Sequence, residues 1–214
     1  MTIHTLIWDF DGTLFDTYPF MVAAFRQALN QLGIDDIEID DQEIYETMRQ
    51  HALGTALQQF SAEFGLGRDQ LNDRYRQIEP TLIGQAKPFD GVSHLLNRHL
   101  ANGGRHFLLT HRNQSALTLL ADNGLATAFS GTVTGDSPYP RKPDPAALNA
   151  LIETYAIDRT TAVMVGDRTL DIEAGHNAGI RGALFDPGRL INEKNSHPEF
   201  LATQMAELEA ALFN

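Results

Sequence analysis

The segment Ile3-His4-Thr5-Leu6-Ile7-Trp8-Asp9-Phe10-Asp11-Gly12-Thr13 joins a short apolar run to two acidic residues. A run of this length that stops abruptly at a charged residue is typical of a buried parallel strand. Open α/β sheets bind their ligands at the carboxyl ends of the strands. The segment therefore predicts a first strand over residues 3–8 that delivers Asp9 and Asp11 to a cleft.

The rest of the chain indicates that this strand belongs to a larger sheet. Three further apolar runs have the character of buried strands: His106–Thr110, Thr161–Gly166 and Gly182–Phe185. Helical patterns lie between and beside them, at Val92–Leu100, Gln114–Asp122, Pro145–Tyr155 and Leu170–Ala178. Because strand and helix alternate after residue 86, the sequence predicts an α/β fold with a doubly wound parallel sheet.

Residues 16–85 interrupt this alternation. Four segments there look amphipathic, and none resembles a strong strand: Met21–Gln31, Asp41–Arg49, Thr55–Phe64 and Asp69–Ile78. The flanking stretches Thr17-Tyr18-Pro19 and Lys87-Pro88-Phe89-Asp90-Gly91 carry the Pro and Gly expected at domain connections. We therefore expect a core formed by residues 1–15 and 86–214, with an all-helical insertion at 16–85.

The composition excludes several classes of protein. The 214 residues carry 16 Lys and Arg against 28 Asp and Glu, a formal charge of −12 that disfavours nucleic-acid and anionic-membrane partners. The chain has no Cys, so disulfide frameworks, zinc ribbons and thiol nucleophiles are excluded. No apolar run approaches a membrane span, and the amino-terminal residues lack the basic region of a signal peptide. These features predict a cytoplasmic protein.

A second acidic pair occurs in Gly166-Asp167-Arg168-Thr169-Leu170-Asp171, after another predicted strand. The four-residue spacing places both carboxylates on one side of a helix start. An alternative is an ordinary strand-to-helix turn, with Thr169 as N-cap and Asp171 favoured by the helix dipole.

Either acidic pair alone is a weak signal, but together they predict a metal site. The first pair, Asp9 and Asp11, does not belong to an EF-hand calcium loop, because the twelfth position counted from Asp9 is Phe20 and not Glu. Three or four carboxylates that converge on one cleft would repel one another unless a hard divalent cation lay among them. Magnesium is the cation we expect.

Two further residues are candidates for binding an anion at this cleft. Thr110 ends a predicted strand, and its hydroxyl and the following amides can bind phosphoryl oxygens, although a strand-terminal Thr is also a common helix cap. Lys142 lies in Arg141-Lys142-Pro143-Asp144-Pro145, where two prolines restrict the backbone before the next helix. The chain has only three lysines, so a lysine in a rigid loop is a stronger candidate than usual.

The order of these motifs resembles the haloacid dehalogenase-like hydrolase superfamily, in its phosphoglycolate phosphatase-like branch. The motifs are Asp9-x-Asp11-Gly12-Thr13, Thr110 after a strand, Lys142-Pro143-Asp144-Pro145 and Gly166-Asp167-x-x-x-Asp171. They span nearly the whole chain and are specific for the superfamily but not for a substrate. The resemblance implies a Rossmann-like core with a helical cap inserted after the first strand, which agrees with the insertion predicted at 16–85.

The resemblance also implies a reaction. It makes Asp9 the nucleophile that forms an aspartyl-phosphate, and Asp11 the general acid that later activates water. Magnesium would be held by Asp9, the Asp11 carbonyl and Asp167, with Asp171 supporting that set of ligands. Thr110, His111 and Lys142 would bind the transferring phosphoryl group. The expected substrate is a small phosphorylated metabolite.

Some positions depart from the family pattern or lie outside it. His111 and Arg112 follow Thr110 where relatives often carry small or amide residues, and they either contact substrate or line the wall of the cleft. In the cap, Arg49 and His51 are candidate substrate contacts, or they lie on a solvated helix end. The other histidines are predicted to pack in the interior or lie on the surface, and these include His94, His99 and His106.

Four alternatives to a phosphatase share parts of this motif set. Dehalogenation is disfavoured because Asp11 is present, and phosphonoacetaldehyde hydrolysis because no lysine precedes Lys87. A sugar phosphomutase would use the same core motifs, and a non-catalytic phospho-binding switch would also cluster carboxylates beside a lysine.

Replacement of Lys142 by alanine is expected to lower kcat/KM by orders of magnitude with little loss of stability.

Overall fold

The computed structural model describes residues 2–213 and divides into two compact units. The first unit contains the chain up to Asp16 and from Pro88 onward, and the second is Thr17–Lys87. The predicted insertion, 16–85, differs from the second unit by one residue at its start and by two at its end.

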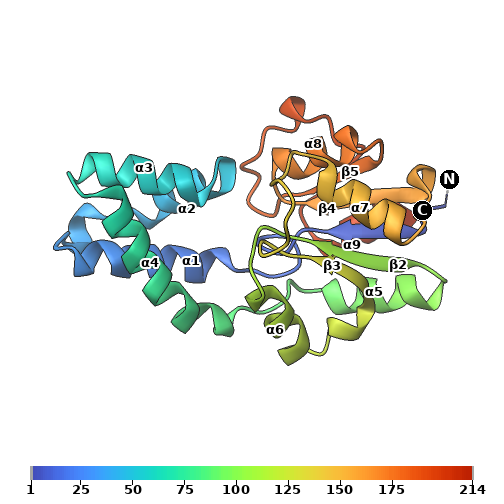
Figure 1. Ribbon diagram of the computed structural model, residues 1–214, viewed down its shortest axis with the longest axis horizontal. Helices are drawn as coiled ribbons and strands as arrows, with labels where there is room; N and C mark the ends of the chain where they lie inside the picture. The colour runs from blue at the N-terminus through green and yellow to red at the C-terminus, as the bar shows by residue number, and fades with distance from the viewer. Residues whose placement is uncertain (1, 214) are drawn as a thin grey trace. The chain divides into compact units, whose positions relative to one another are not determined.

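The first unit is built on a parallel sheet with six strands in the described part of the chain (Figure 1). The strands run in the order β3-β2-β1-β4-β5-β6, and every neighbouring pair is parallel. Their bounds are β1 Thr5–Trp8, β2 Arg105–Leu109, β3 Phe129–Val133, β4 Ala162–Gly166, β5 Arg181–Phe185 and β6 Phe200–Ala202. The α/β fold with a doubly wound parallel sheet is confirmed.

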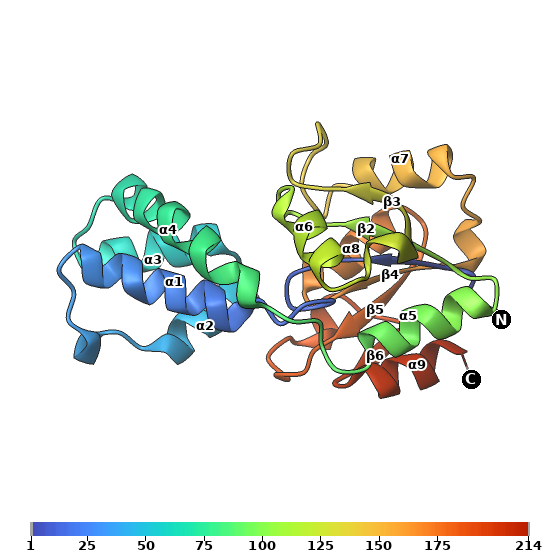
Figure 2. The same cartoon turned by 90° about the horizontal axis from the view of Figure 1, so that it is seen from below.

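Helices cover both faces of this sheet. Helices α5 and α9 lie on one face and α7 and α8 on the other (Figure 2). The first unit contains α5 Val92–Ala101, α6 Ser115–Asp122, α7 Ala146–Thr154, α8 Thr169–Asn177 and α9 Met205–Phe213. Alternate residues of the strands serve the two faces, so that Ile7, Phe107 and Met164 share one buried cluster with α7 and α8. Burial on both faces explains why the strands are apolar almost throughout.

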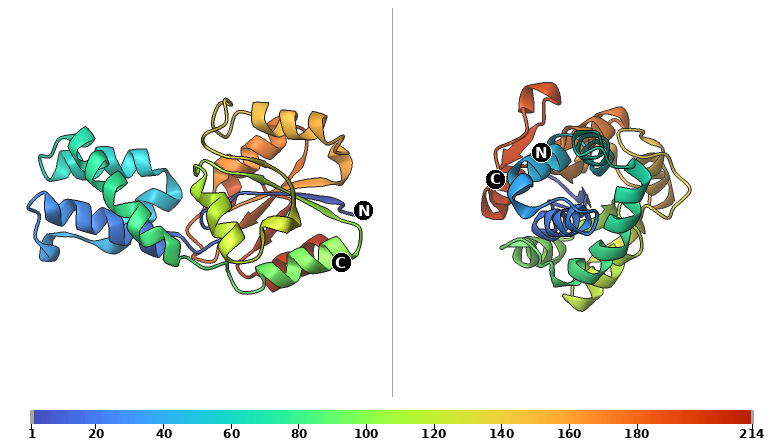
Figure 3. Two further views of the ribbon diagram at one scale, coloured as in Figure 1. Left: turned by 60° about the horizontal axis from the view of Figure 1, so that its bottom comes forward. Right: turned by 90° about the vertical axis from the view of Figure 1, so that its left-hand side faces the viewer.

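The second unit is helical (Figure 3). Its helices are α1 Tyr18–Gln31, α2 Asp41–Gln50, α3 Leu53–Glu63 and α4 Arg68–Leu82. Phe25 of α1 lies at the centre of its core, with the rings of Phe60 and Tyr75 at centroid distances of 5.5 and 6.0 Å. Across residues 2–213, every helix is too short or too polar to cross a bilayer.

The strand order places a topological switch point between β1 and β4. The chain passes from β1 outward to β2 and β3, and then crosses to the other side of β1 to form β4, β5 and β6. In an open α/β sheet, crossover connections leave a crevice at such a point, at the carboxyl ends of the two strands. The residues that follow β1 and β4 are Asp9 and Asp167.

The buried His106 of β2 leads to a prediction about stability at acid pH. The Trp8 indole N–H donates to His106 Nδ1 at 3.0 Å, and His106 Nε2 lies 3.2 Å from the Leu96 carbonyl oxygen. Burial, with a smaller contribution from His99, lowers the pKa of His106 to about 3. The side chain is therefore neutral in the folded protein but protonates near its ordinary pKa when the chain unfolds.

Because the pKa of His106 is lower in the folded than in the unfolded state, its effect on the free energy of unfolding depends on pH. The stability that the neutral side chain provides is fully present above about pH 6.5 and is lost as the pH falls toward 3. Between pH 7 and pH 5 we expect it to remove about 2 kcal/mol of unfolding free energy. Urea unfolding at both pH values should show a smaller drop for His106→Gln than for the wild type. The exposed His94 provides the control, since His94→Gln should keep the wild-type drop.

Candidate active site

Asp9 lies directly after β1 and is held by the backbone of the neighbouring strand. Its N–H donates to the Val165 carbonyl oxygen at 2.8 Å, and the residue is 1% exposed. Oδ1 of Asp9 accepts a hydrogen bond from Lys142 Nζ at 2.7 Å. Oδ2 is buried and has no hydrogen-bond partner among residues 2–213, so this acceptor is unsatisfied in the described part of the chain.

Lys142 connects the carboxylates of this site. Its Nζ lies 2.7 Å from Asp9 Oδ1, 2.6 Å from Asp171 Oδ1 and 3.1 Å from the Leu109 carbonyl oxygen. Burial opposes the charged form, but Asp171 and Asp9 outweigh it and raise the pKa of Lys142. The lysine is therefore a buried ammonium between two carboxylates.

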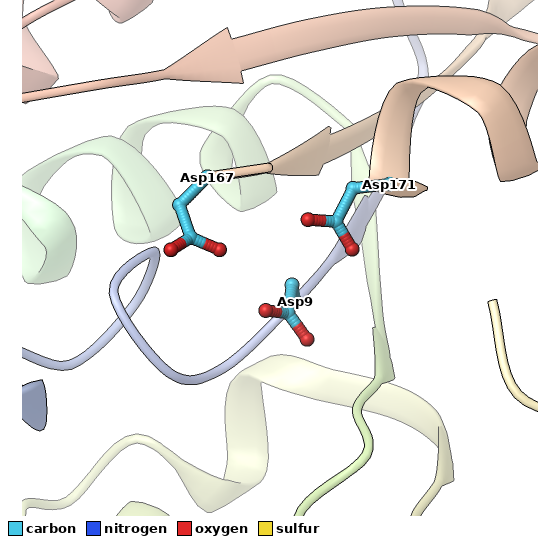
Figure 4. Close-up of side chains that lie close together, drawn as sticks. All are labelled: Asp9, Asp167 and Asp171. Atoms are coloured by element: carbon cyan, nitrogen blue, oxygen red, sulfur yellow. The ribbon is translucent and has the colours of Figure 1, made fainter. Parts of the chain in front are cut away.

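The second acidic pair completes a cluster at the same edge of the sheet. Asp167 follows β4 and Asp171 lies in the first turn of α8, and with Asp9 they bring carboxylate oxygens within 4.8 Å of one another (Figure 4). Gly166 allows this approach, because a Cβ there would lie 2.2 Å from the Asp171 Cβ. The three side chains come from the ends of two strands and the start of a helix.

The helix-start alternative for Asp171 is also part of the structure. Asp171 Oδ2 accepts from the Arg168 backbone N–H at 3.1 Å, as a helix-capping side chain would, while Oδ1 faces Lys142. The N-cap position belongs to Arg168, and Thr169 is the first helical residue. The capping contact and the cluster therefore occur together, since each uses a different oxygen.

Asp11 lies in a tight turn that follows Asp9. The Phe10 carbonyl oxygen accepts from the N–H groups of Thr13, Leu14 and Phe15, and Asp11 itself forms an isolated β-bridge with Phe15. The Asp11 side chain is ion-paired, with Oδ1 at 2.7 Å from Nε of Arg112. The structure thus ties Asp11 to a residue 101 positions away in the sequence.

Thr110 and His111 follow β2 beside Lys142. The Thr110 hydroxyl oxygen accepts from the Arg112 N–H at 3.0 Å, which leaves the hydroxyl proton able to donate to a ligand. His111 Nε2 accepts from the Lys142 N–H at 2.8 Å. Burial and the nearby Lys142 ammonium lower the pKa of His111 to about 3, so it is a neutral imidazole that can offer only Nδ1–H to an anion.

Arg49 and His51 belong to the helical unit. Arg49 is 1% exposed, with its guanidinium carbon 5.4 Å from the centre of the Tyr18 ring. His51 is exposed and caps the end of α2. Their role as substrate contacts stays a prediction.

The contacts of three polar residues of the site were not predicted from the sequence. The Thr13 hydroxyl donates to Asp167 Oδ1 at 3.5 Å, and Arg168 Nε lies 3.8 Å from the same oxygen. Thr13 ends the first acidic motif and Arg168 lies within the second, and these positions were the available signal. The sequence singled out Arg112 as a substrate contact or a wall residue, but nothing in it indicated that Asp11 is its partner.

Known proteins resemble this chain along most of its length. A family model described as haloacid dehalogenase-like hydrolase matches residues 6–185. The phosphoglycolate phosphatase of Rhodospirillum rubrum is 31% identical over 86% of this chain and 79% of its own. The N-acetylmuramic acid 6-phosphate phosphatase of Pseudomonas aeruginosa is 27% identical over 91% of this chain and 87% of its own.

A solved structure extends the likeness of the fold to nearly the whole chain. A HAD-superfamily hydrolase of subfamily IA, variant 1, from Geobacter sulfurreducens superposes with a TM-score of 0.75. The match covers 98% of this chain and 96% of the other, at 21% sequence identity.

Proposed function

The chain belongs to the haloacid dehalogenase-like hydrolase family, and from this premise we propose that it is a magnesium-dependent phosphatase that hydrolyses a small phosphate monoester through an aspartyl-phosphate on Asp9. The observation that carries the proposal is the state of Asp9. One of its carboxylate oxygens is ion-paired with a buried ammonium, and the other is buried with no hydrogen bond from any residue that the structure describes. Such a carboxylate is oriented and has an oxygen left for attack on phosphorus.

The two half-reactions assign a task to each carboxyl group. An Asp9 oxygen forms a bond to phosphorus while the ester P–O bond breaks, and Asp11 gives its proton to the leaving oxygen. Asp11 then takes a proton from water, whose oxygen bonds to phosphorus as the bond between phosphorus and Asp9 breaks. Inorganic phosphate leaves, and both carboxyl groups return to their starting forms. Lys142 and the Thr110 hydroxyl hold phosphoryl oxygens throughout.

The residues present fit a divalent cation. Three carboxylates converge within 4.8 Å, and Lys142, with Arg168 Nε at 3.8 Å from Asp167 Oδ1, offsets part of their negative charge. Asp9, the Asp11 carbonyl oxygen and Asp167 would hold the ion, with Asp171 supporting them, since oxygen ligands suit magnesium. When bound, Mg²⁺ supplies positive charge that counters the repulsion between these carboxylates and the phosphate.

The relatives indicate a chemical class of substrate and not one compound. Two relatives with similar coverage are named for different esters, phosphoglycolate and N-acetylmuramic acid 6-phosphate. Both are small phosphorylated acids, so we propose that the substrate is a small phosphate monoester, with 2-phosphoglycolate as the first compound to assay. The charge of −12 and the absence of Cys support a cytoplasmic enzyme with no nucleic-acid or membrane partner.

Metal removal tests the proposal. After stripping with a chelator, phosphate release from 2-phosphoglycolate and from an aryl phosphate is expected to fall to background, and added Mg²⁺ should restore it. Full activity in excess chelator would overturn the metal model. Repeated turnover of the aryl phosphate would exclude a non-catalytic switch. Phosphoryl return to a sugar phosphate, stimulated by a bisphosphate, would identify a mutase instead.

A further inference from the structure

The ion pair between Asp11 and Arg112 lies where the proposed proton transfer takes place. Nε of Arg112 and Oδ1 of Asp11 are 2.7 Å apart, and their side chains are 8% and 19% exposed. Within residues 2–213, this is the only ion pair or hydrogen bond that the structure gives the Asp11 carboxylate. One oxygen of Asp11 is therefore held, and the other is not.

Arg112 is itself fixed by its surroundings. Its N–H donates to the Thr110 hydroxyl at 3.0 Å, and its carbonyl oxygen accepts from the Gly135 N–H at 2.7 Å. Nη1 lies 3.4 Å from the Ser115 hydroxyl oxygen. Gly135 is required for this close packing, since a Cβ there would lie 2.3 Å from the His111 carbonyl oxygen. The Arg112 backbone is thus hydrogen-bonded to the end of β2 and to the loop after β3, and its guanidinium also contacts Ser115.

We infer that Arg112 is a positioning residue for Asp11, which holds Oδ1 so that Oδ2 faces the oxygen that gains or loses a proton. The inference rests on the proposed function, because it assumes that Asp11 transfers protons in both half-reactions. A partly exposed carboxylate that nothing binds exchanges between rotamers. Displacement of a reacting group by about 1 Å can cost about 100-fold in rate. The guanidinium removes that freedom through a single directed contact.

A double-mutant cycle tests whether Arg112 acts through Asp11. We expect Arg112→Ala to lower kcat about 10- to 100-fold with little change in KM. In an Asp11→Asn background the same substitution should change kcat by less than about threefold, because the group that it positions is already lost. The substrate is an aryl phosphate, whose departure needs no proton, so that in the Asp11→Asn background kcat reports the slow hydrolysis of the phosphoenzyme alone and is measured at high enzyme concentration. Arg112→Lys, which keeps the charge but not the Nε geometry, should recover only part of the loss.

An arginine at the other end of β2 provides the control for this experiment. Arg105→Ala removes an equal charge from the opposite end of β2, where the guanidinium bonds to the Tyr155 carbonyl oxygen, and it should leave kcat and KM unchanged. A rise in KM with unchanged kcat, or an equal loss in both backgrounds, would overturn the inference and identify Arg112 as a substrate contact. If Asp11→Asn turns over like the wild type, the proposed function fails instead. Should Arg112→Ala not fold, Arg112→Gln takes its place in the cycle.

Discussion

The Asp9→Asn variant is expected to release no phosphate above background, a loss of at least about 1000-fold in kcat. The amide keeps the shape of the carboxylate but cannot attack phosphorus to form an acyl-phosphate. The fold should persist, because Lys142 still pairs with Asp171 and the Asp9 N–H still donates to Val165. The measurement is phosphate release by purified variant at saturating substrate, with thermal unfolding as the check on folding.

A labelling experiment separates loss of the nucleophile from loss of binding. With a ³²P-labelled substrate and rapid acid quench, the wild type should show protein-bound label that hydroxylamine releases, as expected for an acyl-phosphate. Asp9→Asn should carry none, whereas Asp11→Asn should accumulate label because hydrolysis of the phosphoenzyme lacks its base. Label on Asp9→Asn, or turnover above a tenth of the wild type, would assign the nucleophile to another residue.

The sequence predicted the parts of the fold that have strong local signals. β1, β2, β4 and β5 are buried on both faces, so they appear as apolar runs. The edge strand β3, Phe-Ser-Gly-Thr-Val, alternates in burial and contains Gly131, and it gave no such run. β6 has only three residues. These two strands gain their place from pairing with β2 and β5, which no local pattern encodes.

The site shows the same division between local and long-range information. Motif order identified Asp9, Lys142, Asp167 and Asp171, and the structure brings all four together at the switch point. The hydrogen-bond and ion-pair partners of the other site residues could not be predicted from the sequence. Asp11 pairs with Arg112 across 101 positions, and His111 accepts a hydrogen bond from the Lys142 backbone N–H. Such contacts depend on how three loops meet at one sheet edge.

The burial of Lys142 revises the expectation that its replacement costs little stability. Lys142 is 5% exposed and bridges two carboxylates that are 1% and 0% exposed. Removing one partner of a buried ion pair leaves uncompensated charge and typically costs about 3–5 kcal/mol. Lys142→Ala should therefore lower both the free energy of unfolding and kcat/KM, the latter by about 1000-fold because the ammonium also holds the phosphoryl group.

Two further variants separate these effects. In Lys142→Ala/Asp171→Asn the second change removes one of the unpaired carboxylates, so it should recover part of the lost stability but none of the lost kcat/KM. Lys194→Ala removes an exposed lysine and should change neither quantity. Urea unfolding and steady-state kinetics on the three proteins decide between the roles. A stable Lys142→Ala with near-wild-type rates would show that neither the ion pairs nor the phosphoryl contact matters.

The pH dependence supplies an independent check on the same lysine. Its pKa is raised in the fold, so its pairing with Asp9 and Asp171 contributes fully below the ordinary lysine value of 10.5 and is lost only as the pH rises through the higher folded value. The difference in unfolding free energy between the wild type and Lys142→Ala should therefore stay constant from pH 7 to about pH 10 and shrink above it. A difference that instead faded between pH 7 and 9 would mean that Lys142 is already losing its proton there, and that the two carboxylates do not hold it as an ammonium.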